Sequence, residues 1–458
     1  MAITAPPASI FKAYDIRGLH GEEMDADTAY LVGRGFARVL ADLRGKEAGE
    51  LVVGLGRDMR LSAPEMAAGV RQGLLDEGAR VLDAGQIATE MLYFLVGSRE
   101  LDGGAMVTAS HNPKAYTGVK LVREGALALS GDAGIQDVRA TIEAGLPEPA
   151  GGGSVEELEI GDEFRKHILG FIEPDSIGPL KVLADGGNGM AGPMVGPLLE
   201  QLNLEVTTSY WTPDGSFPDR EPNPLLEENR RYIVDRVREK GVDLAIAWDG
   251  DADRCFFIDA EGSFCDGDFV CALLARAALI KEPGATVLYD PRSSRAVPDT
   301  VAAAGGRSDL SRVGHAFFKI RMRETEAVFG GEVSGHYYFR DFYCADSGTI
   351  PAVLMLELIS REGRSLSELM SEFRSRYFIS GEINSEVADQ EAKMRELAER
   401  YSDGEIGWLD GVSIDYADWH FNVRPSNTEP LLRLNLESLV SREDMEAKRN
   451  EVLGLIRA

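Results

Sequence analysis

The amino-acid sequence predicts an α/β protein in which three successive βα series precede a smaller C-terminal α+β domain. Apolar, strand-like runs alternate with amphipathic segments along most of the 458 residues. A glycine- and proline-rich stretch at 147–153 interrupts this alternation before it restarts, and after residue 376 the order of elements changes. The chain is too long for one core, so we predict domains at 1–153, 154–258, 259–371 and 372–458.

The first series supplies the clearest alternation. Its predicted strands are 51–55, 80–85 and 105–107, and its predicted helices are 25–42, 62–78 and 90–99. Ser62 is predicted to be the N-cap of the second helix, since Pro64 and Glu65 follow in its first turn. Strands and helices that alternate in this way favour a mostly parallel sheet with helices on both faces.

The later series repeat this pattern with less regular spacing. In the second series we predict helices near 156–171 and 225–240 and strands at 180–185, 204–210, 242–247 and 255–258. In the third we predict helices at 268–281, 293–304, 348–361 and 365–375, a short helix from His315, and strands at 285–290 and 327–329. The last segment is predicted to contain strands at 419–423 and 431–436 and a terminal helix. The similar size of the three βα units suggests a diverged structural repeat.

Composition excludes several classes of function. A net charge of −28 argues against nucleic acid or an anionic membrane as a partner, although a local basic cluster can still bind a small anion. No apolar run is long enough to span a bilayer, and the N-terminus does not look like a secretion signal. The four cysteines form no C-x-x-C pair, which favours neither a zinc site nor a disulfide framework. We therefore expect a cytoplasmic protein.

An acidic loop, Asp249-Gly250-Asp251-Ala252-Asp253-Arg254, predicts a metal site. Its three carboxylates, from Asp249, Asp251 and Asp253, alternate along one tight turn, and hard divalent cations prefer such oxygen ligands. An EF-hand calcium loop would need glycine at the sixth position and glutamate at the twelfth, where Arg254 and Ala260 stand. A solvated acidic turn is disfavoured because apolar strands flank the loop. Three ligands also leave positions open for a phosphoryl oxygen.

A second loop, Thr108-Ala109-Ser110-His111-Asn112-Pro113, ends a buried strand. Asn112-Pro113 stops that strand, and a serine at the carboxyl end of a strand is well placed to present its hydroxyl to a ligand. An ordinary turn, in which Ser110 bonds only local backbone, fits the hexapeptide alone equally well. The acidic loop and two further loops favour a functional Ser110 over an ordinary turn.

Two further loops carry polar side chains suited to a sugar phosphate. Gly330–His336 contains Glu332, Ser334 and His336, and one carboxylate can accept from two adjacent sugar hydroxyls. Arg424–Pro430 offers a guanidinium, hydroxyls and an amide between two strands, as a phosphate cradle would, and Arg433 on the next strand is expected to face the same way. Simple turns remain the alternative for both loops.

These four loops, in this order, resemble those of the α-D-phosphohexomutase superfamily. The resemblance runs from Tyr14-Asp15-Ile16-Arg17-Gly18 to Arg433, and it is strongest with the bacterial phosphomannomutase and phosphoglucomutase branch, which serves nucleotide-sugar pathways. It implies four domains around a central cleft, of which the first three are βα domains with mixed sheets. It also implies a mutase that interconverts hexose 1-phosphates and hexose 6-phosphates through a phosphoserine and a bound 1,6-bisphosphate.

The resemblance assigns roles to individual residues. Ser110 matches the phosphorylated serine, and Asp249, Asp251 and Asp253 match the Mg²⁺ ligands, with a Ser110 phosphate oxygen completing the site. Glu332 and Ser334 match sugar contacts, and the residues that match the loop for the non-reacting phosphate are Arg424, Ser426, Asn427 and Thr428. The remaining expected site residues are Tyr14, Arg17, His111, Lys120, Arg254, His315 and His336, with Lys120 a candidate general base.

The sequence also departs from the family pattern. Arg292 stands where many members carry a substrate-contacting lysine, and Ile87-Ala88-Thr89-Glu90 replaces a proline-rich turn. Tyr337-Tyr338-Phe339-Arg340 differs from many relatives as well. Two other functions compete with a mutase: a metal-dependent sugar-phosphate phosphatase and a non-enzymatic sugar-phosphate sensor. The second phosphate cradle argues against the former, and the intact serine and aspartates argue against the latter.

Overall fold

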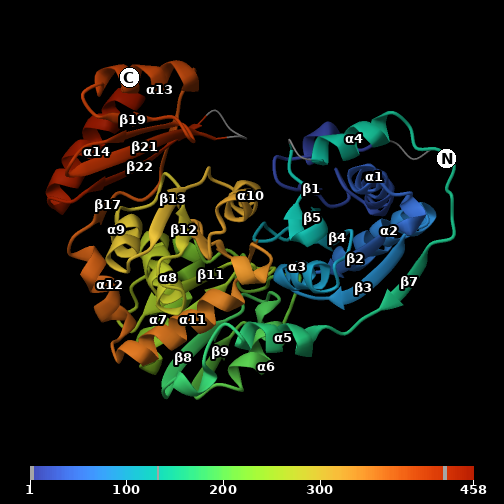
Figure 1. Ribbon diagram of the computed structural model, residues 1–458, viewed down its shortest axis with the longest axis horizontal. Helices are drawn as coiled ribbons and strands as arrows, with labels where there is room; N and C mark the ends of the chain where they lie inside the picture. The colour runs from blue at the N-terminus through green and yellow to red at the C-terminus, as the bar shows by residue number, and fades with distance from the viewer. Residues whose placement is uncertain (1–4, 132–133, 427–430) are drawn as a thin grey trace. The chain divides into compact units, whose positions relative to one another are not determined.

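The structure, a computed structural model, describes residues 5–131, 134–426 and 431–458 (Figure 1). It divides into two compact units, and each is described by itself. Unit 1 comprises Met1–Phe264 and Gly335–Gly363, and unit 2 comprises Cys265–Ser334 and Arg364–Ala458. The predicted third domain, 259–371, thus contributes residues to both units.

The first sheet of unit 1 is mixed, whereas the alternation of elements alone predicted a mostly parallel one. Its strands are β1 (Ile16–Leu19), β2 (Val52–Arg57), β3 (Arg80–Gln86), β4 (Gly103–Val107), β5 (Tyr116–Arg123), β6 (Leu127–Ala128) and β7 (Ser154–Glu157), in the order β1-β5-β4-β2-β3-β7 with β6 beside β5. β2 is parallel to β3 and β4, but β5 is antiparallel to both β4 and β1. The antiparallel pairing arises because a short loop, rather than a crossover helix, joins β4 to β5.

Helices cover both faces of this sheet (Figure 1). They are α1 (Ala26–Arg44), α2 (Ala63–Asp76), α3 (Thr89–Ser98) and α4 (Ile135–Glu143). Residues of α1, α2 and α4 share one core with the sheet, and Leu92 and Leu95 of α3 pack at Gly54 on the other face. Asp25 caps α1 by accepting from the Thr28 N–H. Ser62 stands at the N-cap position of α2, as predicted, but its backbone is in the helical region (φ −78°, ψ −19°) and its side chain makes no capping hydrogen bond.

The predicted helix at 156–171 begins only at Gly161, since α5 spans Gly161–Leu169. Residues 154–157 instead form β7, which pairs with β3 in parallel from Ser154 opposite Arg80 to Glu157 opposite Asp83. Pairing with an available sheet edge outweighs the helix propensity of two glutamates, a tertiary effect that local sequence does not show.

The second sheet of unit 1 carries the acidic loop. Its strands are β8 (Leu180–Asp185), β9 (Leu204–Ser209), β10 (Leu244–Trp248) and β11 (Cys255–Asp259), in the order β11-β10-β8-β9. Only β11 is antiparallel to its neighbour, so β10 and β11 form a hairpin with the acidic loop at its tip. Unit 1 also contains α6 (Ala191–Leu199), α7 (Glu227–Lys240), β15 (Tyr337–Phe339), β16 (Ala345–Asp346) and α11 (Thr349–Glu362).

Unit 2 combines a parallel sheet with an antiparallel one, as the change in element order predicted. The parallel strands are β12 (Thr286–Tyr289), β13 (Arg307–Leu310) and β14 (Phe329–Gly331), with β12 in the middle; the accompanying helices are α8 (Gly267–Lys281), α9 (Ala296–Ala303), α10 (His315–Thr325) and α12 (Leu366–Arg374). The antiparallel sheet contains β17 (Phe378–Ile379), β18 (Ile383–Glu386), β19 (Glu405–Gly407), β20 (Val412–Asp415), β21 (Trp419–Pro425) and β22 (Leu431–Ser438), with α13 (Gln390–Arg400) and α14 (Arg442–Ile456).

Arg295 joins the two parts of unit 2 just before α9. Its guanidinium donates to the carbonyl oxygens of Tyr416 at 2.5 Å and Ala417 at 3.0 Å, and its backbone N–H donates to Glu437 at 3.1 Å. Tyr377 adds a hydrogen bond of 2.7 Å to Asp299 on α9. Polar bonds therefore fix the C-terminal sheet against the parallel one.

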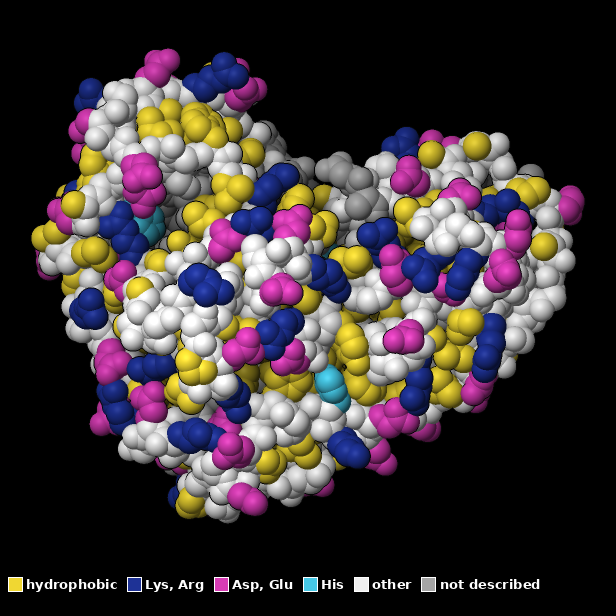
Figure 2. All heavy atoms as spheres, viewed as in Figure 1, with side chains coloured by type: hydrophobic (Ala, Val, Ile, Leu, Met, Phe, Trp, Pro, Cys, Tyr) yellow, Lys and Arg dark blue, Asp and Glu magenta, His cyan; other side chains and the backbone are white. Residues whose placement is uncertain are grey.

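Acidic and basic side chains are interspersed over the surface in view in Figure 2. Among the described residues, no helix combines the length and the apolar character that a membrane crossing requires.

The crossing of α1 and α2 depends on glycine. A Cβ at Gly33 would lie 2.3 Å from the Val70 carbonyl oxygen, so the two helices approach backbone to backbone. We expect Gly33→Ala to lower the free energy of unfolding by about 1–3 kcal/mol, because the helices must separate. Gly454→Ala on α14, where a Cβ would meet no described atom within 4 Å, is the matched control and should be neutral or slightly stabilising. Urea unfolding of both variants measures the difference, and equal stabilities would contradict the close crossing.

Candidate active site

Ser110 occupies the turn at the carboxyl end of β4 in a left-handed conformation (φ 49°). Its N–H donates to Thr108 Oγ1 at 2.8 Å, which fixes the turn. Its hydroxyl donates to Asp249 Oδ2 at 3.1 Å and lies 3.2 Å from His111 Nδ1. A strained, buried serine between a carboxylate and an imidazole is not an ordinary strand-ending turn.

Arg60 binds carbonyl oxygens of the Ser110 loop, and it was not predicted from the sequence. Its guanidinium donates to the carbonyl oxygens of Ser110, Asn112, Pro113 and Tyr116 at 2.7, 2.6, 3.0 and 3.2 Å. Asp58 lies 3.3 Å from Arg60 Nε, and both side chains are almost completely buried. β2 and β4 are parallel neighbours, so the residues that follow them meet at one edge of the sheet. Arg60 could have been predicted from this placement only if the order of the strands in the sheet were already known.

The three aspartates of the acidic loop converge as predicted. They are buried, and one ligand oxygen from each lies within 4.8 Å of the others. The loop reverses through Ala252, which has φ 61°. A Cβ at Gly250 would lie 2.6 Å from the Ser110 carbonyl oxygen, so glycine is needed for the acidic loop to approach the serine loop.

Two cations compensate part of this buried negative charge. Lys120 Nζ donates to Asp251 Oδ2 at 2.7 Å and to Asp253 Oδ2 at 2.5 Å. Arg254 donates to Asp249 Oδ2 from Nε at 2.9 Å and from Nη2 at 2.7 Å. Lys120 comes from β5, opposite Met106 of β4, which explains how a residue ten positions after Ser110 returns to the same site.

The pKa shifts reflect burial and crowding of like charges. Burial and the neighbouring Asp251 raise the pKa of Asp253, and burial raises the pKa of Asp249 against the pull of Arg254. Burial also opposes ionisation of Asp251, but Lys120 outweighs it and lowers the pKa of that carboxyl. Burial and the positive charges of Arg254 and Arg17 lower the pKa of His111.

The residues present fit a divalent metal ion. Oδ1 of Asp251 and Oδ1 of Asp253 are buried and accept no hydrogen bond from the described residues. Buried carboxylate oxygens without a donor are costly unless a cation approaches them, and hard divalent ions bind such oxygens. Asp249, Asp251 and Asp253 are therefore the ligand set that the geometry supports.

Other predicted residues of unit 1 lie around this centre. Arg17 donates to Asn112 Oδ1 at 2.8 Å and pairs with Asp15. His336 and Asp253 belong, with Asp346, to a second group of ligand atoms within 4.8 Å of one another. Tyr14 is half-buried near the start of β1.

Unit 2 brings together two of the predicted sugar-binding residues. Arg292 Nη2 lies 3.2 Å from Glu332 Oε2, which also accepts from the Gly314 N–H at 3.1 Å, next to His315. Asp290, which the sequence did not single out, binds the Arg292 guanidinium through both carboxylate oxygens at 2.8 Å. The arginine at position 292 is therefore held by two carboxylates. Ser334 follows Glu332 closely in the same loop.

The predicted phosphate cradle is also in unit 2. Arg424 and Arg433 pair across β21 and β22, so the two side chains share one face of the sheet, as expected. Both donate to Glu382, at 2.8 and 3.2 Å, and Arg433 approaches Ser426 Oγ at 3.4 Å. Glu382 was not expected from the sequence. The predictions for Asn427 and Thr428 concern residues outside the described ranges.

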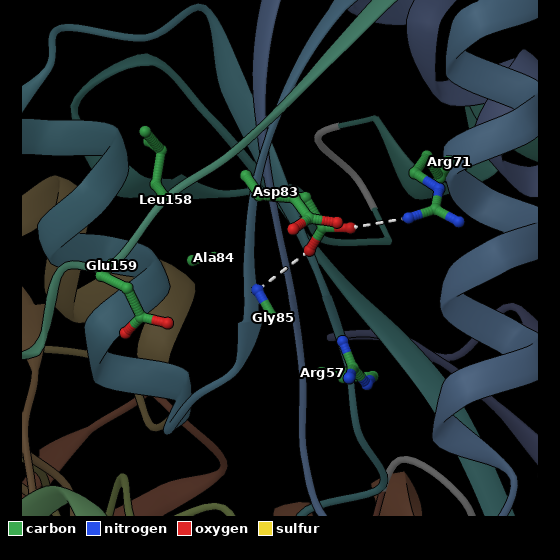
Figure 3. A pocket seen from close by; sticks show the side chains of 8 residues that line it. Arg57, Arg71, Asp83, Ala84, Gly85, Leu158 and Glu159 are labelled. Carbon is green, nitrogen blue, oxygen red and sulfur yellow. Dashed lines mark hydrogen bonds and ion pairs between the residues drawn. The ribbon is translucent and has the colours of Figure 1, made fainter.

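A separate hollow of about 380 Å³ lies in unit 1 beside the ends of β2 and β3 (Figure 3). Figure 3 shows Asp83 accepting from Arg71 at 3.1 Å and from the Gly85 N–H at 2.9 Å. Arg57 and Glu159 complete its mixed-charge lining, and no predicted site residue is among the described residues that line it. We do not assign this hollow to the reaction.

The acidic centre beside a buried serine is typical of enzymes that transfer phosphoryl groups. Comparisons with known proteins agree. Models of phosphoglucomutase/phosphomannomutase alpha/beta/alpha domains I, II and III match residues 8–147, 162–262 and 266–377, and the C-terminal domain model matches 382–455. The chain belongs to the phosphoglucomutase/phosphomannomutase family, within the α-D-phosphohexomutase superfamily.

Individual relatives cover nearly the whole chain. A phosphomannomutase of Salmonella montevideo is 42% identical over 456 residues, covering 97% of this chain and 98% of its own. A protein of Xanthomonas campestris named "Phosphohexose mutases" is 42% identical over 451 residues, covering 98% and 99%. A crystal structure of a phosphoglucomutase/phosphomannomutase family protein from Burkholderia thailandensis has a TM-score of 0.90 and 31% identity, covering 98% of this chain and 97% of its own. The chain is thus a phosphohexomutase, an intramolecular phosphotransferase, and the phosphatase and sensor alternatives are not favoured.

The role of Arg60 can be tested by a charge-conserving change. We expect Arg60→Lys to reduce kcat about tenfold or more, because one ammonium cannot serve four carbonyl oxygens with the geometry of a guanidinium. Arg99→Lys is the matched control, since Arg99 is exposed and forms an ion pair with Glu163. Steady-state kinetics with circular dichroism measures both effects. Unchanged kcat in Arg60→Lys would show that the loop holds its shape without this arginine.

Proposed function

We propose that this enzyme interconverts the 1-phosphates and 6-phosphates of mannose and glucose through a phosphoserine at residue 110. The observation that carries the proposal is the Ser110 hydroxyl held 3.1 Å from Asp249 in a buried cluster of three aspartates and two cations. Proteins named phosphomannomutase at 42% identity over nearly the whole chain support the choice of substrate.

The proposed reaction consists of two phosphoryl transfers. Phosphoserine 110 donates its phosphoryl to the free hydroxyl of a hexose monophosphate, so the Oγ–P bond breaks, a new O–P bond forms on the sugar, and the hydroxyl proton leaves. The resulting 1,6-bisphosphate reverses its orientation and returns its other phosphoryl to Ser110. Mg²⁺ bound to Asp249, Asp251 and Asp253 would supply positive charge for the phosphoryl oxygens.

The chain's own residues take distinct parts in this scheme. Arg17, Lys120 and Arg254 add positive charge near Ser110. Lys120, a candidate general base, is paired with Asp251 and Asp253. These carboxylates outweigh the effect of burial and raise the pKa of the ammonium, so Lys120 would have to give up a proton before it could act as a base. His111, whose Nδ1 lies 3.2 Å from Ser110 Oγ, is the alternative acceptor. Glu332 and Ser334 would contact sugar hydroxyls, and Arg424, Ser426 and Arg433 would hold the non-reacting phosphate, with His315, His336 and Arg292 lining the substrate site.

The phosphoserine can be tested directly. Ser110→Ala should fold normally and lose nearly all mutase turnover, because no other group is in place to carry the phosphoryl. Intact-mass measurement should show one phosphate on the wild-type protein after treatment with hexose 1,6-bisphosphate, lost on adding hexose monophosphate. Ser154→Ala, an exposed serine on β7, should keep both the phosphate and the activity. Wild-type turnover in Ser110→Ala would remove the mechanism.

Substrate range tests the sugar contacts. Glucose and mannose share their hydroxyls at C3 and C4 and differ at C2, so a site that binds O3 and O4 through Glu332 and Ser334 should accept both. We expect kcat/KM for the two 1-phosphates to agree within about a thousandfold, roughly 4 kcal/mol, with 2-N-acetyl substrates poorer. A coupled assay measures each. A larger difference would reveal a contact to C2.

The cradle is tested through Arg424. Arg424→Ala should raise KM for hexose phosphate about tenfold or more, since a bidentate phosphate contact is lost, while a bisphosphate donor still phosphorylates Ser110 less efficiently. Arg442→Ala, at the start of α14, is a control for the loss of a positive charge. If KM stayed unchanged for Arg424→Ala, the non-reacting phosphate would bind elsewhere.

A further inference from the structure

The first turn of α3 contacts the acidic loop directly. Thr89 begins the helix, and its side chain is completely buried. Its N–H donates to the Asp251 carbonyl oxygen at 3.0 Å, and its hydroxyl donates to Asp251 Oδ2 at 2.6 Å. One residue therefore fixes both the backbone and the carboxylate of a single aspartate. In the sequence, residues 87–90 stood out only because they replace a proline-rich turn of the family pattern.

The two carboxylate oxygens of Asp251 have different surroundings. Oδ2 accepts from Thr89, from Lys120 at 2.7 Å and from Thr108 at 3.3 Å. Oδ1 is buried and accepts no hydrogen bond from the described residues. A carboxylate whose one oxygen is saturated by fixed donors cannot rotate freely, so its other oxygen keeps a constant direction. Thr89 makes the shortest of the three contacts.

Thr89 is itself held in place through Glu90. The Glu90 carboxylate, completely buried, accepts from the hydroxyls of Ser347 and Thr349 and from the Thr349 N–H at 3.3 Å. Ser347 Oγ in turn accepts from the Ile350 N–H at 3.0 Å and so caps α11. α3 is thereby bonded to the acidic loop by one residue and to the start of α11 by the next.

The start of α11 also abuts the acidic loop. Trp248 Nε1, at the end of β10, donates to the Gly348 carbonyl oxygen at 2.9 Å. A Cβ at Gly348 would lie 2.5 Å from the Ala252 carbonyl oxygen, so these backbones are in close contact. The acidic loop is thus supported on two sides by elements that Glu90 joins, and Thr89 cannot move without disturbing both.

We propose that Thr89 is a positioning residue for the metal site: its hydroxyl fixes Asp251 so that Oδ1 is presented to the divalent cation. This inference rests on the metal site described under Proposed function. Partners of metal-binding carboxylates commonly set metal affinity although they never touch the metal. Thr89 is completely buried, and its effect on the metal would pass through Asp251.

The test is metal binding by the purified full-length protein, measured without substrate. Thr89→Val keeps the side-chain shape and removes the hydroxyl, so Mn²⁺ affinity, followed by electron paramagnetic resonance, should fall about 10- to 100-fold. Mg²⁺ affinity by calorimetry should fall in parallel. Thr89→Ser, which restores the hydroxyl, should regain most of the affinity. Thr89→Ala provides a second variant without the hydroxyl if the valine variant does not fold.

The controls separate this inference from the metal site itself. Thr141→Val on α4 is a matched substitution of a half-buried threonine in unit 1 and should bind Mn²⁺ like the wild type. Asp253→Asn should lose Mn²⁺ binding; if it does not, the metal site is wrong. If Asp253→Asn loses binding but Thr89→Val stays within twofold of the wild type, the Thr89 inference alone is overturned. Equal loss in Thr89→Val and Thr89→Ser would also overturn it, since the hydroxyl would then not matter.

Discussion

The pairing of three buried aspartates with two cations is the interaction on which the rest of the site depends. Isolated carboxylates of this kind would be strongly destabilising in a protein interior. Lys120 and Arg254 supply two positive charges against three negative ones, which leaves one negative charge uncompensated. A bound divalent ion would reverse the sign of that excess and make the centre attractive to a phosphate dianion. The two cations also reduce the energetic cost of burying the three carboxylates of the acidic loop.

The scaffold around this centre is built from strand ends. The Ser110 loop follows β4, Arg60 follows β2 and the acidic loop follows β10. Each of these groups therefore lies within a few residues of a strand end, and the strand fixes its position. Gly250 allows the acidic loop to approach the Ser110 carbonyl, and Thr89 ties α3 to the same loop. Because these contacts come from different strands and helices of unit 1, a small displacement of any one of them would shift the position of Ser110.

The sequence predicted the parts of the site that lie in short, chemically distinct motifs. Ser110, the three aspartates and the pairing of Arg424 with Arg433 belong to local patterns whose residue types are few and whose spacing is tight. Arg60, Thr89 and Glu382 were not predicted because they contact segments that are distant in the chain. For Arg60, the relevant fact is that β2 lies beside β4, and a single sequence does not contain it. Residues 156 and 157, which the sequence predicts as helix, belong to β7 for a similar reason, since its partner β3 is distant in the chain.

Glu382 affects which anions the proposed cradle would bind. Its carboxylate bonds both Arg424 and Arg433, so the two guanidinium groups already carry an internal counter-ion. An incoming anion must exchange with this carboxylate rather than fill an empty positive site. Chloride and other weakly bonding monoanions gain too little from that exchange, whereas a phosphate dianion offers more charge and more acceptor oxygens than the carboxylate it displaces. In the proposed cradle, this exchange would favour phosphate esters over the common salts of the surroundings.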